Sequence, residues 1–288
     1  MMQCKNKKRV WLITGASKGL GFAFTSAALA AGDCVAAISR TTDSLEKLQG
    51  DYPDTLYPCA LDVTNRTAVF ETVNNIANHF GRIDIAINNA GTMVLGMIEE
   101  FDEIMVRQVM ETNFFGALWV SQAVLPWVRG QHSGHIIQIS SIGALVTGPM
   151  AGVYSASKFA LEGMSEALAQ EVAGFGIKLT IVEPGGYWTN LYLSVKYNEP
   201  LNAYAPLREK TGEEARETVD SDPALAAQAL LILVNSEKPP LRLILGGTVC
   251  EYAKQATSDR LKEWAQWEKL CQSAEHATPP PPGYGVSE

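Results

Sequence analysis

The 288-residue sequence lacks the long apolar run that a membrane-spanning helix would need. No segment offers about 18 uninterrupted apolar residues, and the apolar stretch Val10–Ile13 is too short for the core of a signal peptide. The net charge of −8 also gives no support to binding of nucleic acid or anionic membranes. We therefore expect neither a membrane span nor a nucleic-acid partner.

Cysteine and histidine are also scarce, which limits metal and redox chemistry. The five cysteines are scattered, and no pair has the spacing of a metal or redox motif. Of the four histidines, His132 and His135 lie in a Gly/Ser-rich turn with no acidic or cysteine partner beside them. The sequence therefore predicts no metal site, reduced thiols and a cytoplasmic location.

What the sequence does contain is an alternation of short apolar runs and longer amphipathic stretches. The strand-like runs are KRVWLIT, CVAAIS, TLYPCAL, IDIAIN, GHIIQIS, KLTIVE and LRLIL. The helix-like stretches are Phe22–Ala31, Asn65–Phe80, Glu99–Val128, Tyr154–Gly174 and Pro223–Asn235. Strands that alternate with helices pair in parallel, and nearly continuous apolar strands are covered on both faces. The pattern predicts an α/β fold, a single domain over residues 1–272 with a doubly wound, mostly parallel seven-stranded sheet.

Two segments break this alternation. Residues 187–222 are aromatic in their first half and charged in their second, so we expect a helical lid insertion. Its residues 187–204 should fold over a substrate while the charged remainder stays solvated. A C-terminal helical extension is expected at about 248–271. Three surfaces are candidates for contact with its Tyr252, Trp264 and Trp267: the substrate cleft, a neighbouring subunit or, as the favoured interpretation, the core. The proline run that follows predicts a flexible tail over 273–288.

The turn TGASKGLG lies between the first strand and the first helix. Its glycines let the backbone approach a ligand, and the helix N-terminus offers unpaired N–H groups to a pyrophosphate. Glycine-rich turns are common, but this position in a strand–turn–helix unit indicates dinucleotide binding. The cofactor-binding residues expected here are Gly15, Ser17, Lys18, Gly19, Leu20 and Gly21.

The end of the second strand bears on the choice between NAD and NADP. Many NAD-binding proteins place an acidic residue there, but this strand ends in Ser39 and Arg40. A ribose phosphate would meet Arg40, and Lys18 could supply a second cation. The alternative is that both are solvated loop charges. The missing acid and the two cations favour NADP(H) over NAD(H).

Four motifs carry a family resemblance. In chain order they are TGASKGLG, Leu61-Asp62-Val63, NNAG at Asn88–Gly91 and YSASK from Tyr154. The same order is found in the classical short-chain dehydrogenases/reductases, which the sequence resembles from residue 8 to about 190. The resemblance implies a Rossmann-type fold and a homo-dimer or homo-tetramer. The further cofactor-binding residues it implies are Asp62, Val63, Asn89, Gly91, Tyr154, Lys158, Pro184, Gly185 and Thr189. The NNAG residues are also of a kind that stabilises the sheet and the turn.

The tyrosine and lysine of YSASK stand four residues apart, so they share one helix face. A nearby ammonium favours the phenolate and lowers the pKa of a phenol from near 10. The resemblance implies that Tyr154 is the general acid/base and that Lys158 lowers its pKa and binds the nicotinamide ribose. It also implies that Ser141, thirteen residues earlier, holds the substrate carbonyl in preference to Ser140. Asn113 of ETNFFG would complete the tetrad by ordering a water against the lysine.

These features predict an NADP(H)-dependent oxidoreductase acting on the carbonyl or secondary alcohol of an apolar substrate. Steroid-, retinoid-, aromatic- and aliphatic-type compounds all suit the aromatic lid. Tyr187, Trp188 and Tyr192 are the expected substrate contacts. One alternative is a non-catalytic NADP-binding regulator on the same fold. Another is hydrolysis by Ser141, for which no histidine base lies nearby in the sequence.

Overall fold

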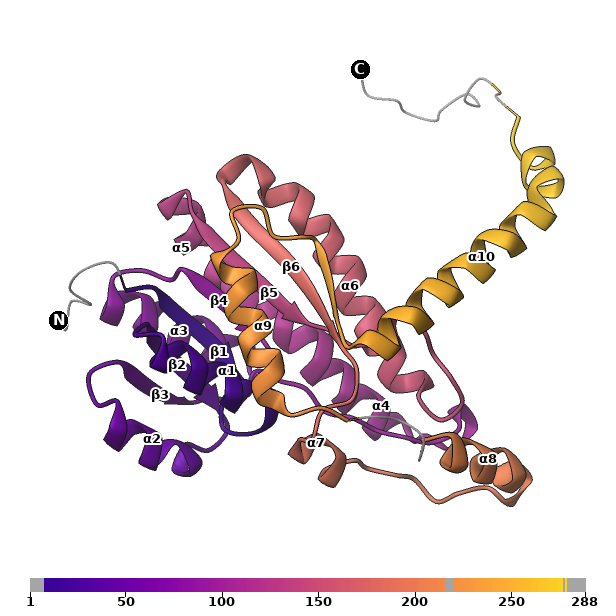
Figure 1. Cartoon of the computed structure of the whole chain (residues 1–288), viewed down its shortest axis with the longest axis horizontal. Helices are drawn as coiled ribbons and strands as arrows, with labels where there is room; N and C mark the ends of the chain where they lie inside the picture. The colour runs from indigo at the N-terminus through magenta and orange to yellow at the C-terminus, as the bar shows by residue number, and fades with distance from the viewer. Residues whose placement is uncertain (1–7, 216–219, 277, 279–288) are drawn as a thin grey trace.

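The computed structural model describes residues 8–215, 220–276 and 278, without the side chains at 190, 192, 214 and 215. Within this part of the chain, seven parallel strands form one sheet in the order β3-β2-β1-β4-β5-β6-β7 (Figure 1). The strands are β1 (Val10–Thr14), β2 (Cys34–Ser39), β3 (Leu56–Ala60), β4 (Ile85–Asn88), β5 (Gly134–Ile139), β6 (Ile177–Pro184) and β7 (Arg242–Leu245). The predicted α/β class and doubly wound sheet are confirmed.

Helices cover both faces of the sheet (Figure 1). They are α1 (Gly19–Ala30), α2 (Glu46–Asp51), α3 (Arg66–Phe80), α4 (Glu103–Met110), α5 (Gly116–Gln131), α6 (Gly152–Val172), α7 (Asn190–Leu193), α8 (Ala205–Ala215), α9 (Pro223–Asn235) and α10 (Gly247–Ser273). Helices α3, α5 and α6 pack on one face, and α1 and α9 pack on the other. None of the described helices is both long and apolar enough to cross a membrane.

The alternation of side chains along β1 explains why the strand runs are nearly continuously apolar. Val10 and Leu12 belong to the core beneath α3, α5 and α6. Trp11 and Ile13 belong to the core beneath α1 and α9. Successive residues of a strand point to opposite faces, so a strand covered on both faces must be apolar at every position.

The strand order locates the site. The chain builds β1, β2 and β3 outward from the centre and then returns to β4, which pairs with the other side of β1. The order therefore reverses between β1 and β4. Ligands of open α/β sheets bind at the carboxyl ends of the strands beside such a switch point.

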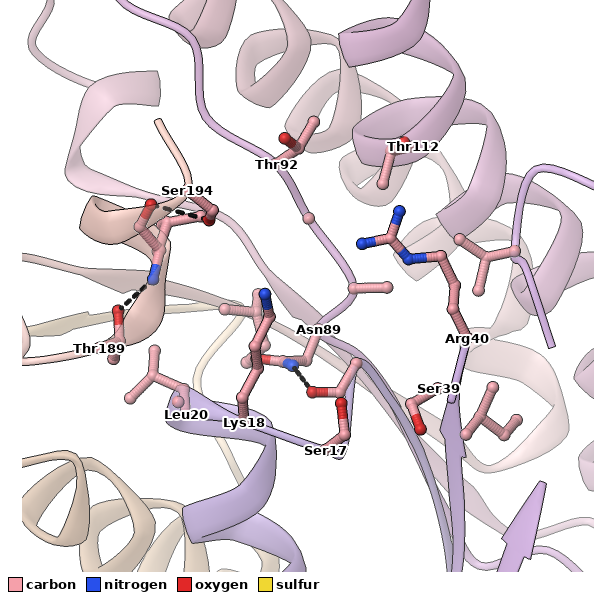
Figure 2. Close-up of a pocket in the computed structure, with 18 of the residues that line it drawn as sticks. Ser17, Lys18, Leu20, Ser39, Arg40, Asn89, Thr92, Thr112, Thr189 and Ser194 are labelled. Atoms are coloured by element: carbon pink, nitrogen blue, oxygen red, sulfur yellow. Dashed lines mark hydrogen bonds between the residues drawn. The ribbon is translucent and has the colours of Figure 1, made fainter. Parts of the chain in front are cut away.

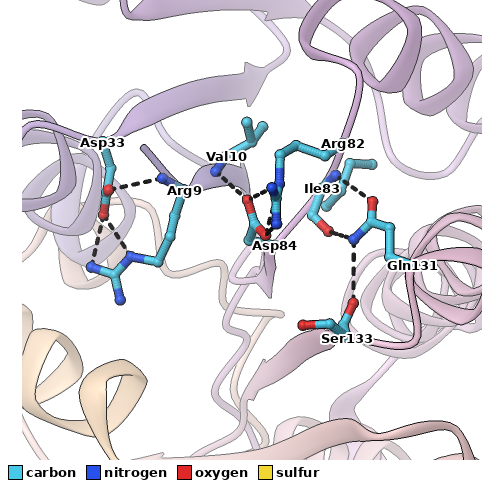
Figure 3. Close-up of polar contacts among 8 residues, drawn as sticks. All are labelled: Arg9, Val10, Asp33, Arg82, Ile83, Asp84, Gln131 and Ser133. Carbon is cyan, nitrogen blue, oxygen red and sulfur yellow. Dashed lines mark hydrogen bonds and ion pairs between the residues drawn. The ribbon is translucent and has the colours of Figure 1, made fainter. Parts of the chain in front are cut away.

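At the opposite end of the strands, polar side-chain contacts hold the amino ends of the strands in place (Figure 3). The contacts join Arg9 to Asp33, Val10 and Arg82 to Asp84, and Ile83 and Ser133 to Gln131. The Asp84 carboxylate accepts the Val10 N–H at 2.8 Å, and Asp33 accepts the Arg9 N–H at 3.1 Å. Both carboxylates are hydrogen-bonded within the fold, so the amino ends of the strands are occupied by structural contacts.

The single helix predicted over Glu99–Val128 is wrong, because the chain is interrupted twice there. Asp102 caps a new helix by accepting the Met105 N–H at 2.7 Å, so α4 begins only at Glu103. A π-helical turn, Glu111–Phe115, then separates α4 from α5. Interruptions of this kind are frequent at functional sites.

The C-terminal helix is present, but its expected packing against the core is wrong. Tyr252, Trp264 and Trp267 of α10 are 58%, 60% and 58% exposed, and of its described side chains only Ala253 is buried. The helix leaves the sheet after β7 and extends beyond the body of the protein (Figure 1). Among the described residues, no surface of the same chain covers these three aromatic side chains. Of the predicted tail, 273–288, Ser273 still belongs to α10, whereas residues 277 and 279–288 lie outside the described residues.

Cysteine chemistry also departs from the prediction of reduced thiols. Cys34, at the start of β2, is disulfide-bonded. Cys59, Cys250 and Cys271 are free thiols. Burial raises the pKa of Cys59 to about 12, so this thiol is kept in its unreactive protonated form.

Candidate active site

A cleft of about 1460 Å³ opens at the carboxyl ends of the strands beside the switch point (Figure 2). Most of the residues predicted to bind a cofactor line it. They are Gly15, Ser17, Lys18, Gly19, Leu20, Ser39, Arg40, Asp62, Val63, Asn89, Gly91, Tyr154, Lys158, Pro184, Gly185 and Thr189. Gly21 does not line the cleft and packs behind the turn. The structure thus brings together, on one surface, residues spread over most of the sheet.

The glycine turn has a backbone that side chains would obstruct. Gly15 and Gly19 have φ values of +66° and +56°, which residues with a Cβ rarely adopt. A Cβ added at Gly21 would lie 2.2 Å from the Gly15 carbonyl oxygen. Since α1 begins at Gly19, its free N–H groups open toward the cleft. The turn therefore forms a cradle for an anionic group such as a pyrophosphate.

Asn89 fastens this turn to β4. Its side-chain amide donates to the Thr14 carbonyl at 2.9 Å and to the Gly15 carbonyl at 3.2 Å. The Asn89 and Ala90 N–H groups both donate to the Thr14 hydroxyl at 3.0 Å. These bonds support the alternative interpretation of NNAG, in which its residues stabilise the turn and the sheet.

The two predicted phosphate-binding cations extend into the same cleft from different turns. Figure 2 shows Lys18 rising from the glycine turn and Arg40 from the end of β2, with their charged ends in the space below Thr92 and Thr112. Both side chains are exposed, and within the described residues neither forms an ion pair. The cleft therefore presents two unpaired positive charges beside the cradle.

The catalytic candidates meet where β5 ends against the first turns of α6. Tyr154 is 9% exposed and Lys158 is 5% exposed, and both line the cleft. The Lys158 Nζ donates to the Ile139 carbonyl at 2.8 Å and lies 5.9 Å from the centre of the Tyr154 ring. Ser141 hydrogen-bonds Tyr154, and its Oγ accepts the Gly143 N–H at 3.1 Å. Ser141, Tyr154 and Lys158 thus form one group.

The neighbouring serines Ser140 and Ser141 have different hydrogen-bond partners. The Ser140 hydroxyl donates to the Glu162 carboxylate at 2.6 Å and is 4% exposed. Only Ser141 hydrogen-bonds Tyr154. Adjacent residues at a strand end point in opposite directions, so only one of the two serines faces the phenol.

The expected lowering of the Tyr154 pKa is not what this structure shows. Burial raises the pKa of the Tyr154 phenol, and the hydrogen bond with Ser141 only partly opposes this. Burial also lowers the pKa of Lys158 to about 8, which the charge of Glu162 partly opposes. The ammonium is bonded to a carbonyl and lies several ångströms from the ring. Desolvation of the phenolate is therefore the larger of the two effects on the Tyr154 pKa.

Asn113 lies in the π-helical turn and does not line the cleft. Its side-chain amide donates to the Thr92 carbonyl and to the Ser157 hydroxyl, each at 2.9 Å, and its oxygen accepts the Thr92 N–H at 2.8 Å. All of these partners belong to the protein. Asn113 thus ties the helix to α6 and to the segment after β4, and its predicted role with a water stays a prediction.

The three predicted substrate contacts differ in their position relative to the cleft. Tyr187 is 8% exposed and lines the cleft. Trp188 is 69% exposed and is not among the residues that line the described cleft, so its contact with a substrate stays a prediction. Tyr192 belongs to α7, but its side chain lies outside the described part of the structure.

The charged half of the lid is not wholly solvated, contrary to the prediction. Arg208 of α8 pairs at 2.6 Å with Glu100, whose side chain is 1% exposed. Glu100 also accepts the Leu201 N–H at 2.9 Å. The Arg208 guanidinium lowers the pKa of Glu100 to about 2, so the carboxylate stays charged. One ion pair therefore anchors the lid to the body.

Several residues that line the cleft were not predicted from the sequence. They are Thr92, Ile104, Arg107, Gln108, Glu111 and Thr112. Leu191, Ser194 and Lys196 also line it, from the segment predicted to fold over a substrate. Thr92 directly follows NNAG, so its position could have been predicted. The residues of α4 line the cleft because of the way the helices pack, and no local sequence motif predicts this packing.

This fold and this group of residues define a class of protein: a doubly wound α/β domain with serine, tyrosine and lysine in its cleft. The sequence matches the short chain dehydrogenase family over residues 9–199. The chain therefore belongs to the short-chain dehydrogenase family, and its class of activity is that of an oxidoreductase.

Individual relatives extend the similarity to nearly the whole chain. The protein is 38% identical over 272 residues to Oxidoreductase BOA17 of Botryotinia fuckeliana, which covers 91% of this chain and 97% of that protein. A short-chain dehydrogenase from Streptomyces avermitilis superposes with a TM-score of 0.89 and 38% identity, over 94% of this chain and 100% of that one. A short chain dehydrogenase from Burkholderia cenocepacia in complex with NADP has a TM-score of 0.72 and 25% identity, over 92% and 98%.

Proposed function

We propose that the protein is an NADP(H)-dependent oxidoreductase that moves a hydride between the nicotinamide and the carbonyl or secondary-alcohol carbon of an apolar substrate. The observation that carries the proposal is the position of Tyr154, hydrogen-bonded to Ser141 in the cleft that also holds the glycine cradle. The bound cofactor would supply or accept the hydride. The protein must then handle the proton and the charge on the substrate oxygen.

The protonation of Tyr154 suits carbonyl reduction. Since burial raises its pKa, the phenol is protonated at neutral pH and can donate its proton to the substrate oxygen. Ser141 lies beside it and can hydrogen-bond the same oxygen. In alcohol oxidation the phenolate would accept the proton, and the positive charge of Lys158 would favour that form.

Cofactor selection rests on Lys18 and Arg40. Both charges extend into the cleft without an ion-pair partner among the described residues, and the strand end beside Arg40 carries no carboxylate. A ribose phosphate between them would gain charge-assisted hydrogen bonds. Asp62 lines the same region, but its Oδ1 already accepts the Thr64 N–H and hydroxyl at 3.0 and 2.8 Å. The arrangement favours NADP(H), as bound in the Burkholderia cenocepacia relative.

The substrate end of the cleft favours an apolar compound. Tyr187 and Leu191 line it at the start of the lid. The glycine turn approaches the same segment, because a Cβ added at Gly19 would lie 3.1 Å from the Thr189 Cβ. The cofactor and substrate positions are therefore adjacent, as hydride transfer requires.

The other two hypotheses find less support. A non-catalytic NADP-binding regulator has no need of an acid/base group, yet Ser141, Tyr154 and Lys158 are assembled. Hydrolysis by Ser141 needs a base, and no histidine lines the described cleft. His135, expected in a turn, instead lies on β5, where its Nε2 is hydrogen-bonded to the Thr180 hydroxyl at 3.0 Å.

The proposal is tested by turnover of the purified protein. The oxidation of NADPH and of NADH is followed by absorbance with a panel of small, aromatic, aliphatic and steroid-like carbonyl compounds. We expect turnover with NADPH and an apolar carbonyl, and its loss in Tyr154→Phe with little change in cofactor affinity. NADPH binding without turnover of any carbonyl or alcohol would favour the regulator.

A dimer or tetramer remains part of the proposal. The exposed aromatic side chains of α10 would be costly to leave in water, which favours association. Sedimentation of the full chain measures this directly. A monomer at micromolar concentration would contradict it.

A further inference from the structure

A buried ionic cluster lies directly behind the catalytic group, and the proposed reaction does not use it. Glu162 of α6 is 4% exposed and Glu183 of β6 is fully buried. Arg242 of β7 joins the two carboxylates through its Nη1. Its Nη2 pairs at 2.7 Å with Glu166, a half-exposed residue one turn further along α6. Burying charged side chains costs desolvation free energy, so a cluster that joins three elements suggests a functional role.

The cluster touches the strand end that carries the active site. One oxygen of Glu162 accepts the Ser140 hydroxyl at 2.6 Å while the other pairs with Arg242. Ser140 lies between Ile139, whose carbonyl accepts the Lys158 ammonium, and Ser141, which hydrogen-bonds Tyr154. A shift of Ser140 would therefore move both contacts together.

Glu162 also acts on Lys158 through its charge. The two residues lie one turn apart on α6, and the negative charge of Glu162 raises the pKa of Lys158 against the effect of burial. The proton on this lysine is thus retained partly because Glu162 is charged.

On the basis of the proposed function, we propose that Glu162 is a positioning residue of the active site. Its carboxylate holds Ser140, and with it the end of β5, while its charge keeps Lys158 an ammonium near neutral pH. Arg242 of β7 pairs with Glu162 and fixes the position of its carboxylate.

The other charged groups around Glu162 do not reverse this effect. Burial raises the pKa of Glu183, which favours its neutral form. Glu166 contacts Arg242 but is 49% exposed, so solvent screens its charge. Tyr154 is protonated at neutral pH, because burial raises its pKa. Glu162 is therefore the buried negative charge that supports the Lys158 ammonium.

The experiment compares Glu162→Gln with the matched control Glu166→Gln, which removes a carboxylate from the same helix and from the same arginine. Lysine side chains are labelled with carbon-13 next to Nζ and titrated by NMR in the full chain without cofactor. The Lys158 signal is identified by its absence in Lys158→Met. We expect a midpoint of about 8 in the natural sequence. It should fall by about one pH unit in Glu162→Gln and stay in place in Glu166→Gln.

Turnover separates this inference from the proposed function. If the function is right, the alkaline limb of the kcat/KM profile moves to lower pH in Glu162→Gln alone. A shifted lysine midpoint without turnover in any form would refute the function and leave the positioning role standing. Normal turnover with an unmoved midpoint and an unmoved limb would overturn the positioning role alone.

A variant without a change of charge covers the case in which Glu162→Gln does not fold. Ser140→Ala removes only the bond that holds the strand end. We expect kcat to fall about tenfold while the lysine midpoint stays in place. An unchanged kcat would overturn the proposal.

Discussion

The buried ammonium of Lys158 should destabilise the protein near neutral pH, and this cost should disappear in alkali. The side chain is 5% exposed, and burial lowers its pKa from the ordinary 10.5 to about 8. Between these two values the unfolded chain binds more protons at this site than the folded chain does. Stability contributed by the site must therefore rise as the pH rises from about 8 toward 10.5.

The size of the effect follows from the shift. A difference of about 2.5 pH units corresponds to about 3 kcal/mol of unfavourable ionisation near neutral pH. Methionine at this position removes the charge but leaves the buried Ile139 carbonyl without its 2.8 Å donor, at a cost of about 1–3 kcal/mol. Near pH 7 the removal of the unfavourable ionisation nearly offsets the lost hydrogen bond. Near pH 10 only the lost hydrogen bond still destabilises the variant. The difference in unfolding free energy between natural protein and Lys158→Met should therefore grow by about 2–3 kcal/mol in favour of lysine.

Denaturant unfolding of both proteins, followed by tryptophan fluorescence near pH 7 and near pH 10, measures this double difference. All other titrating groups are common to both proteins and cancel. The variant should also lose turnover and NADPH affinity, so stability and activity would diverge near neutral pH. A stability difference that is the same at both pH values would refute the reasoning.

Three further predictions concern the reaction. Tyr154→Phe should abolish turnover but leave NADPH affinity nearly unchanged in a fluorescence titration; substantial turnover would contradict its role. Ser141→Ala should lower kcat about 100-fold or more, a larger loss than in Ser140→Ala, because only Ser141 faces the phenol; the reverse order would show that the wrong serine was assigned. Neutral residues at Lys18 and Arg40 should weaken NADPH by about 1.5–3 kcal/mol for each lost contact and leave NADH nearly untouched; equal losses for both cofactors would remove the basis for the NADP preference.

The strands were predictable because each is a local run of apolar residues covered on both faces of the sheet. The glycine turn was equally local, since Gly15 and Gly19 occupy positive-φ positions that the spacing of TGASKGLG anticipates. The helix boundaries were harder to predict from the sequence than the strands were. The break before α4 depends on the Asp102 cap, and the π-helical turn at Asn113 depends on contacts with Thr92 and Ser157.

The helices between residues 187 and 222 and the C-terminal helix were predicted from the sequence, but the surroundings of these helices were not. An aromatic stripe predicts that a helix buries one face without saying where that face finds a partner. Trp264 and Trp267 are exposed because α10 leaves the edge of the sheet. Arg208 looks like a solvated charge in the sequence, yet it pairs with Glu100, more than a hundred residues away.

The sequence by itself determined the order of the strands and helices, the glycine cradle and the helical spacing of Tyr154 and Lys158, because each depends on neighbouring residues. The tertiary structure alone decided which serine faces the phenol, how far Lys158 lies from the ring and which charges surround it. It also decided the directions of the pKa shifts, since desolvation depends on all the elements that close over a group. Glu162, Glu183 and Arg242 stand far apart along the chain, and only the pairing of β6 with β7 beneath α6 brings their charges together.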